Sequence, residues 1–377
     1  MNRLITSLCI LAALLPTVTS CGGGNDSVSG SRSDIGIKYA RNLKIENVDD
    51  EYTLVTLRNP WDTTKVQAKY ALVDKSSQAP RNVPADAVMV KVPLDKSVVY
   101  SAVHMTLLDE LGALDAVSGA CDVEYIGDPE IKERIRKGVI QDCGNGMTPN
   151  MERIITLRPG AVLLSPYENS NDNAKFAGTG IPVVMTADYM ESTPLARAEW
   201  MRFYGRLYGK GAEADSLFSV VEANYNRVKE RNSKIKDKPS VMFDMIYSNI
   251  WNVPTSGSVT GHFIEDAGGV NPFAGYNKAG SVQLSPEEVL FKARNADIWL
   301  IRYFNADSLS LNWLAKENPI YSKFKAWKDG KVYVSDTAKT NIFVDGSFHP
   351  DRILSEMTEI IHPSEKSDSL KYYRKLK

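Results

Sequence analysis

Two stretches of the chain follow the same pattern: ERIITLRPGAVLL at residues 152–164 and EEVLFKARNADIW at residues 287–299. In each, a glutamate opens a predicted helix, two aliphatic residues follow, and an alanine nine residues after the glutamate leads a hydrophobic strand. A helix that runs into a buried strand is typical of a parallel α/β sheet. Because the pattern occurs once in each half of the chain, we predict two pseudo-symmetric α/β lobes.

The region between these halves contains no predicted strand. From Thr193 and Pro194 to about Lys236 the apolar periodicity is helical, with helices over 195–208 and 212–235 joined across Gly209–Gly211. Threonine before proline is a favourable start for a helix. We therefore predict an α/β fold of two Rossmann-like lobes with parallel-rich sheets. A single long bridging helix at residues 193–236 joins them, and the ligand cleft lies between the lobes.

The remaining boundaries follow from this division. The N-terminal lobe is predicted at residues 51–192 and begins with an extra hairpin at 51–80, to which we assign no role. The C-terminal lobe is predicted at 237–362, followed by a polar tail at 363–377. We expect little closure of the lobes on ligand binding, because a continuous bridging helix resists bending.

The N-terminus has the features of a secretion signal. Arg3 precedes an apolar run, Leu4–Leu15, which is too short to span a bilayer and is followed by Val18, Thr19, Ser20 and Cys21. This pattern resembles a bacterial lipobox, with an ordinary secretory signal as the alternative. The resemblance implies a lipoprotein signal peptide at 1–20 and a lipidated tether at 21–50 that begins at Cys21. We therefore expect a protein of the cell envelope or periplasm that is lipid-anchored to the membrane.

Composition narrows the class of protein. The formal net charge is −1, so nothing indicates a nucleic acid as partner. In an exported chain Cys121 and Cys143 favour a disulfide, with two buried free thiols as the alternative. The four histidines lack the paired spacing of a zinc site, and we find no nucleophile elbow or phosphate-binding glycine loop. We therefore do not expect an enzyme, a bound cofactor or a metal centre.

Short motifs along the chain resemble one known family. PNMERI at 149–154, followed by Arg158 and Pro159, resembles the N-lobe signature of the cobalamin and ferric-siderophore periplasmic binding proteins. LSPEEVL at 284–290 resembles its C-lobe counterpart, and NPIY at 318–321 with FKAWKDGKVY at 324–333 resembles the C-terminal block. The resemblance covers about residues 85–362. It implies that Glu152 and Glu287 dock on arginines of a dimeric ABC importer permease, with Glu288 as the alternative to Glu287.

The ligand cleft is expected at the loops that follow the strands, where open α/β sheets bind ligands. These loops are rich in aromatic residues, which suit flat or hydrophobic-faced ligands. The candidate ligand-binding residues are His104, Tyr125, Tyr167, Trp251, Tyr276, Tyr303, Phe304 and Phe343.

The chemistry of these residues favours a bulky metal chelate. Cobalamin is nearly neutral and fits best, whereas an anionic ferric siderophore needs a cation cluster and only Arg302 and Lys339 are at hand. Haem would need an axial ligand from His104, Tyr125 or Tyr167. We expect a monomeric substrate-binding lipoprotein that delivers its chelate to a permease. A capture lipoprotein that serves an outer-membrane transporter, and an enzyme with its site in the cleft, are the alternatives.

Overall fold

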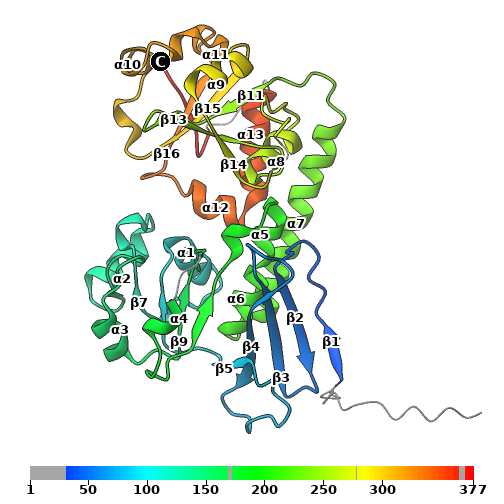
Figure 1. The fold of residues 1–377 in the computed structure, drawn as a ribbon, viewed down its shortest axis with the longest axis vertical. Coiled ribbons are helices and arrows are strands. Elements are labelled where there is room, and N and C mark those ends of the chain that lie inside the picture. Colours follow the sequence, from blue (N-terminus) through cyan, green and yellow to red (C-terminus); the bar gives the residue numbers. More distant parts are fainter. Residues whose placement is uncertain (1–30, 169–171, 277, 365–369) are drawn as a thin grey trace, which may run out of the picture.

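The computed structural model describes residues 31–168, 172–276, 278–364 and 370–377. Two α/β lobes lie one above the other (Figure 1). The sheet of the N-terminal lobe has the strand order β10-β9-β6-β7-β8 and is parallel throughout. Its strands are β6 (Ser97–Val99), β7 (Val117–Ala120), β8 (Gln141–Asp142), β9 (Ala161–Leu164) and β10 (Val183–Met185). All four residues of β9 are buried, as expected for a strand covered on both faces.

The C-terminal lobe repeats the parallel arrangement. Strands β11 (Val241–Phe243), β15 (Ile298–Tyr303) and β16 (Val332–Asp336) are parallel neighbours. A smaller antiparallel sheet contains β12 (Ile246–Tyr247), β13 (Ile250–Pro254) and β14 (Ser281–Leu284). The prediction of two α/β lobes with parallel-rich sheets is therefore confirmed.

Helices flank both sheets. Those of the N-terminal lobe are α1 (Ala102–Glu110), α2 (Pro129–Arg136), α3 (Met151–Leu157) and α4 (Asp172–Lys175). Those of the C-terminal lobe are α8 (Val259–Asp266), α9 (Pro286–Ala293), α10 (Leu311–Glu317), α11 (Lys325–Lys328), α12 (Ile342–Phe348) and α13 (Pro350–Ile361). Helices α3 and α9 are the two that the matching sequence stretches predict. Among the described residues, no helix is long and apolar enough to cross a bilayer.

The bridge between the lobes is three helices rather than one. They are α5 (Pro194–Glu199), α6 (Met201–Leu207) and α7 (Gly211–Ser233), and α7 runs from the lower lobe to the upper one (Figure 1). The break falls at the predicted glycines, where Gly209 has φ of +69° and the chain turns back on itself. A side chain at Gly205 would lie 2.5 Å from the Cβ of Ala214, so α6 and α7 pack closely at this turn.

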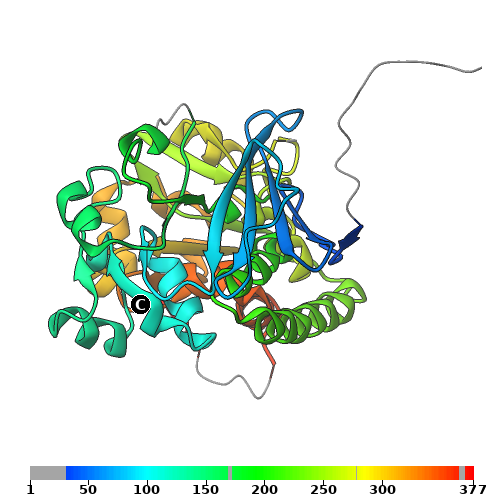
Figure 2. The ribbon, with the colours of Figure 1, turned by 90° about the horizontal axis from the view of Figure 1, so that it is seen from below.

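The N-terminal prediction is wrong in one respect. Strands β1 (Arg32–Asp34) and β2 (Leu43–Val48) lie within the predicted tether, and the predicted hairpin is β3 (Tyr52–Arg58) with β4 (Val66–Asp74). Together with β5 (Ala87–Val92) they form one five-stranded sheet. Most residues of β2 and β3 are buried or half-buried, and Leu43, Ile45 and Val55 join the core of the N-terminal lobe. The sheet stands beside the bridge helices (Figure 2).

The end of the chain is also more ordered than the predicted polar tail. Strand β17 (Arg374–Lys375) pairs antiparallel with β16 and completes the sheet of the C-terminal lobe. Tyr372, Tyr373 and Leu376 are buried, so the tail belongs to the fold because its apolar side chains have a place in the core.

Candidate functional site

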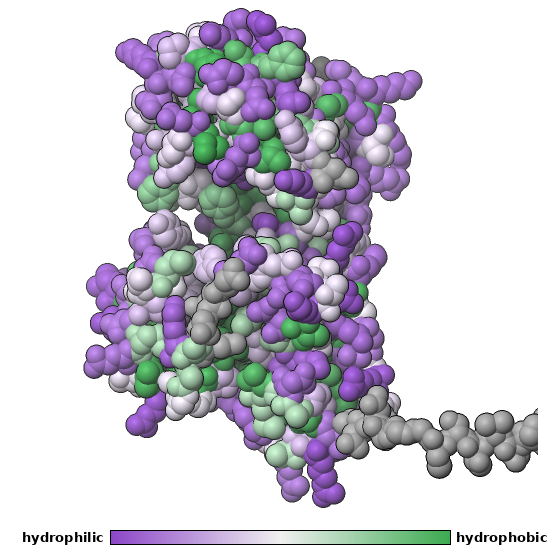
Figure 3. Space-filling model, viewed as in Figure 1, coloured by the Kyte–Doolittle hydropathy of each residue, from purple (hydrophilic) through white to green (hydrophobic). Residues whose placement is uncertain are grey.

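A cleft lies between the lobes, where the carboxyl ends of both parallel sheets face each other. It contains two neighbouring cavities that share Val103 as a lining residue. We call them the hinge cavity, of about 580 Å³, and the N-lobe cavity, of about 560 Å³. The molecule is visibly hollowed at this level, with apolar residues in the hollow (Figure 3). Each cavity has the size of a small-molecule site.

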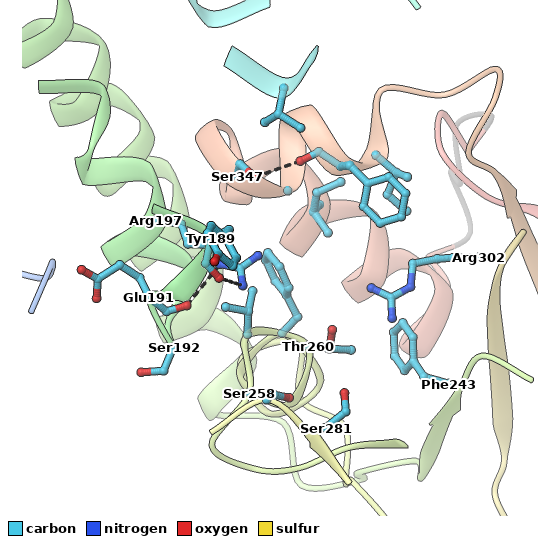
Figure 4. Close-up of a pocket in the computed structure, with 18 of the residues that line it drawn as sticks. Tyr189, Glu191, Ser192, Arg197, Phe243, Ser258, Thr260, Ser281, Arg302 and Ser347 are labelled. Carbon is cyan, nitrogen blue, oxygen red and sulfur yellow. Dashed lines mark hydrogen bonds between the residues drawn. The ribbon is translucent and has the colours of Figure 1, made fainter. Parts of the chain in front are cut away.

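The hinge cavity lies between the bridge and the C-terminal lobe. Its walls come from α5, α8, α12 and α13, from the ends of β11 and β15, and from the chain end (Figure 4). Two arginines on different elements line it: Arg197 on α5 and Arg302 on β15. Burial is the main cause that lowers the pKa of Arg197, and the two guanidinium groups are close enough for the charge of Arg302 to add to this lowering.

Arg302 is fixed by a carboxylate behind it. Its Nε donates to Asp244 Oδ1 at 3.0 Å and its Nη2 donates to Oδ2, so one edge of the guanidinium is fully paired. The group lies over the ring of Phe243, 5.4 Å from its centroid, and points into the cavity (Figure 4). Burial lowers the pKa of Arg302, but the charge and hydrogen bonds of Asp244 outweigh this and raise it. The cation is therefore permanent.

Arg197 is held by the loop that precedes its helix. Its Nε donates to the carbonyl oxygen of Glu191 at 3.1 Å and its Nη2 to that of Tyr189 at 2.6 Å. Burial lowers the pKa of Arg197, yet a guanidinium stays charged in proteins. Because its partners are neutral carbonyls, its charge remains available to a ligand in the cavity.

Glu191 also belongs to the wall of the hinge cavity, but its carboxylate is turned away from the cavity toward the N-terminal segment (Figure 4). Its oxygens accept from the backbone N–H of Asn42 at 2.9 Å and of Arg41 at 3.1 Å, and from Trp200 Nε1 at 3.2 Å. Burial raises the pKa of Glu191, and these hydrogen bonds only partly oppose the shift. The N-terminal segment thus reaches the wall of the hinge cavity, which no sequence signal indicated.

Four of the predicted ligand-binding residues lie at the cleft. Tyr125 and Tyr167 line the N-lobe cavity and Phe343 lines the hinge cavity, and all three side chains are more than half exposed. Phe304 lies across from Tyr125, with the ring centroids 6.2 Å apart in an edge-to-face arrangement. Because Tyr125 belongs to the N-terminal lobe and Phe304 to the C-terminal lobe, this aromatic pair spans the mouth of the cleft.

The structure places the other four elsewhere. His104 is 2 % exposed, and its Nε2 lies 2.9 Å from Asp188 Oδ1 and 3.0 Å from the hydroxyl of Tyr204. The prediction that this histidine lines the cleft as a candidate haem ligand is therefore wrong. Trp251 is fully buried and donates to the carbonyl oxygen of Phe243. Tyr276 and Tyr303 pack against the core of the C-terminal lobe and line neither cavity.

The predicted disulfide is not formed. Cys121 and Cys143 are buried free thiols on neighbouring strand ends, and their Sγ atoms point at two different carbonyl oxygens, those of Cys143 and Gln141. Burial raises the pKa of both thiols, that of Cys143 to about 11, so they act as small apolar side chains. The alternative prediction, two buried free thiols, is therefore confirmed.

The two glutamates occupy matching places. Glu152 and Glu287 are each the second residue of a short helix, α3 and α9, one on each lobe (Figure 1). Both are exposed, and neither side chain forms a hydrogen bond or ion pair with any residue that the structure describes. Glu288, in contrast, is engaged in a capping box with Ser285. Cys21 lies outside the described residues.

Among the described residues, no group of three or more histidine, cysteine or acidic side chains is arranged to hold a metal ion. What the cleft offers is two aromatic-rimmed cavities and two arginines. Such a site can bind a bulky ligand between two lobes.

Comparison with known proteins agrees with this geometry. The family model described as periplasmic binding protein matches residues 98–338, and the chain belongs to this family. It is 26% identical over 350 residues to an uncharacterized lipoprotein of Methanocaldococcus jannaschii, covering 87% of this chain and 82% of the relative. It is 24% identical over 340 residues to the iron-uptake system-binding protein of Bacillus subtilis, covering 88% and 90%.

Solved structures show the same fold. An ABC transporter substrate-binding protein from Listeria monocytogenes superimposes with a TM-score of 0.55 at 20% identity, covering 72% of this chain and 99% of that one. The periplasmic heme-binding protein of Vibrio cholerae gives a TM-score of 0.57 at 17% identity, covering 71% and 100%. The family match begins at residue 98, so the N-terminal sheet precedes the family's common part.

Proposed function

We propose that this chain is the substrate-binding component of an ABC importer and that it captures an anionic metal chelate, of the ferric-siderophore or haem kind, in the cleft. The observation that carries the proposal is the convergence of Arg197 and Arg302, from different elements, on one cavity with an aromatic rim. The names of the relatives support it, since one is an iron-uptake binding protein and another binds haem.

Cobalamin is the second candidate, and the charge balance of the cleft favours it. Asp244 pairs with Arg302, and the buried carboxylate of Glu191 lies behind the cavity wall, so two carboxylates offset the charge of the two arginines. A nearly neutral corrinoid would meet little net charge there. The two candidates differ in whether they need the arginines.

A binding titration tests both. A soluble form that starts at Asn25 is titrated with a ferric tris-catecholate, haemin and cyanocobalamin, with tryptophan fluorescence and visible absorption as readouts. We expect the anionic chelates to bind most tightly. The double variant Arg302→Gln with Asp244→Asn should weaken their binding by about tenfold or more, since a charge-assisted contact contributes about 1.5–3 kcal/mol. Lys339→Ala is the control, because Lys339 pairs with Asp307 and lines neither cavity. Tight binding of cobalamin alone would transfer the proposal to the corrinoid.

The remaining parts of the proposal concern delivery and location. Glu152 and Glu287 dock on a permease dimer, because they are matching, exposed and unpaired carboxylates on the two lobes. A lipid at Cys21 anchors the chain in the cell envelope, which agrees with the naming of two archaeal relatives as lipoproteins. Metabolic labelling with a fatty acid, compared between the full chain and Cys21→Ser, tests the anchor. Label that persists in the variant would rule it out.

A further inference from the structure

The last residues of the chain are held rigidly beside the hinge cavity. The carboxylate of Glu356 on α13 accepts the backbone N–H groups of Lys371 at 2.7 Å and of Tyr372 and Tyr373 at 2.8 Å each. Strand β17 then pairs with β16, and the N–H of Leu376 donates to the carbonyl oxygen of Val332 at 2.8 Å. The segment is therefore fixed on both sides of Tyr373.

Tyr373 lines the hinge cavity, and Tyr372 does not. The Tyr372 hydroxyl donates to Asp345 on α12. The Tyr373 hydroxyl, in contrast, forms no hydrogen bond with any described residue, although the residue is only 5 % exposed. The oxygen is not one of the unpartnered polar atoms that the fold shields from solvent, so a group in the hinge cavity can reach it. The partner of Tyr373 is therefore to be sought in what fills the cavity.

Arg302 supplies the second donor at this corner. Its Nε and Nη2 are occupied by Asp244, and its Nη1 donates to none of the residues that the structure describes. Tyr373 lies near enough that Arg302 acts on it electrostatically, but burial dominates and raises the pKa of the phenol. At neutral pH the phenol therefore keeps its proton and can donate it in a hydrogen bond.

We propose that the Tyr373 hydroxyl and the free edge of the Arg302 guanidinium together bind an anionic oxygen of the ligand, a carboxylate or a catecholate. This inference rests on the proposed function and refines it to a ligand class. One neutral donor and one cationic donor at the floor of an apolar cavity favour an oxyanion over a neutral amide. The C-terminal segment, beyond the end of the family match at residue 338, thus contributes a binding residue.

The first test is Tyr373→Phe, which removes the hydroxyl and keeps the ring in the core. We expect affinity for a ferric tris-catecholate or haemin to fall roughly tenfold to a hundredfold, the effect of a hydrogen bond to a charged group. Affinity for cyanocobalamin should stay within about twofold. Tyr372→Phe is the matched control, with unchanged affinity for all three. Unchanged affinity for the anionic chelates in Tyr373→Phe overturns the inference and leaves the importer function intact.

A second test does not depend on the chelate. 3-Fluorotyrosine is placed at position 373 of the full chain, and its ¹⁹F resonance is followed during titration with sulfate. The resonance should shift in the wild type, and the shift should vanish in the double variant Arg302→Gln with Asp244→Asn. If the wild type binds none of the chelates, the proposed ligand class fails. The sulfate titration then still tests whether Tyr373 and Arg302 bind an oxyanion. If sulfate does not shift the ¹⁹F resonance of position 373 in the wild type, the inference is overturned.

Discussion

Glu287 and Glu288 are neighbours in sequence with different tasks in the structure. The side chain of Glu288 accepts from the backbone of Ser285, and Ser285 Oγ accepts from the backbone of Glu288, so this carboxylate stabilises the start of α9. Glu287 points to solvent beside it. Sequence alone left open which of the two meets the permease, and the capping box assigns Glu287 to that role as a proposal.

Replacing Glu287 and Glu152 by alanine should therefore reduce uptake without changing ligand affinity. Loss of one partner of a desolvated charge pair costs about 2 kcal/mol or more, so uptake of a radiolabelled chelate should fall at least tenfold. Glu288→Ala is the control. Its uptake should stay near that of the wild type, and its Tm should drop by roughly 2 °C because the cap is lost. Normal uptake by the Glu152→Ala, Glu287→Ala double variant would contradict the docking role.

His104 is a structural residue. It forms a buried cluster with Asp188 and Tyr204, whose hydroxyl donates to Asp188 Oδ1 at 2.6 Å. Burial raises the pKa of Asp188, but the charge and hydrogen bond of His104 and the hydrogen bond of Tyr204 outweigh it, and the pKa is lowered. Stability from this lowered pKa is present above the pKa of the unfolded carboxyl and is lost as pH falls through the folded value.

His104→Ala should therefore destabilise the protein by about 3 kcal/mol, since it leaves a buried carboxylate with one partner fewer. Urea unfolding followed by circular dichroism measures the change. The partly exposed His262, on α8, provides the comparison: His262→Ala should shift the midpoint little. Haem binding should be the same in both variants. A Soret band lost selectively in His104→Ala would restore the histidine as an axial ligand.

The sequence could not predict which individual aromatic side chains are exposed at the cleft and which are buried in the core. Phe343 and Trp251 were both expected in loops that follow strands, but Phe343 lies on α12 with 52 % exposure at a cavity and Trp251 lies in β13 and is fully buried. Trp251 packs against Trp299, Tyr321 and Phe324, which come from distant parts of the chain. Arg197 was missed for a related reason, because its neighbours in sequence indicate only a helix.

At the scale of elements, the helices whose first turns carry clear sequence signals were predicted correctly. The helices that begin at Met151 and Pro286 were predictable because proline, capping residues and glutamate mark their first turns. Strand β2 and strand β17 were missed. Strand β17 has two residues and pairs with β16 some forty residues earlier, so no local pattern marks it. Strand β2 forms a hairpin with β3, but Lys44, Glu46 and Asn47 among its six residues weaken the strand signal.

One side chain connects the starts of two strands and a helix in the C-terminal lobe. Asp297 accepts from the N–H of Ser240 at 2.9 Å and from Lys325 Nζ at 2.6 Å. Burial opposes ionisation, but the hydrogen bonds of Lys325 and Ser240 lower the pKa of Asp297 to about 2. A lowered folded pKa means that the stabilisation is complete above about pH 4 and disappears as pH falls toward 2.

Asp297→Asn should consequently lower the free energy of unfolding at pH 7 and flatten its dependence on pH between about 4 and 2. The effect should be moderate, because Asp297 keeps 34 % side-chain exposure and solvent screens the pair. Urea titrations at several pH values measure it. Asp50→Asn, at an exposed turn between β2 and β3, should leave the pH profile as it is. If the free energy of unfolding depends on pH in the same way in the wild type and in Asp297→Asn, the lowered pKa of Asp297 does not contribute to stability.

For the whole molecule, the bridge is not the sole connection between the lobes. Helix α12 of the C-terminal lobe ends in Phe348, which is 1 % exposed and belongs to the core of the N-terminal lobe. The Nε2 atom of the next residue, His349, lies 2.6 Å from Oε2 of Glu110 on α1. The lobes are thus joined by α7 on one side and by α12 on the other, and α12 also lines the hinge cavity.

Two connections should keep the lobes nearly fixed when a ligand binds. Little closure remains a prediction, but its reason changes: the bridge is broken at Gly209, and we expect α12 to supply the stiffness instead. We predict that the radius of gyration from X-ray scattering differs by less than about 1 Å between ligand-free and chelate-saturated protein. Phe348→Ala removes the insertion and should widen that difference, whereas Phe291→Ala, at an 85 % exposed site on α9, should not. A large change in the wild type would show that the lobes move despite both connections.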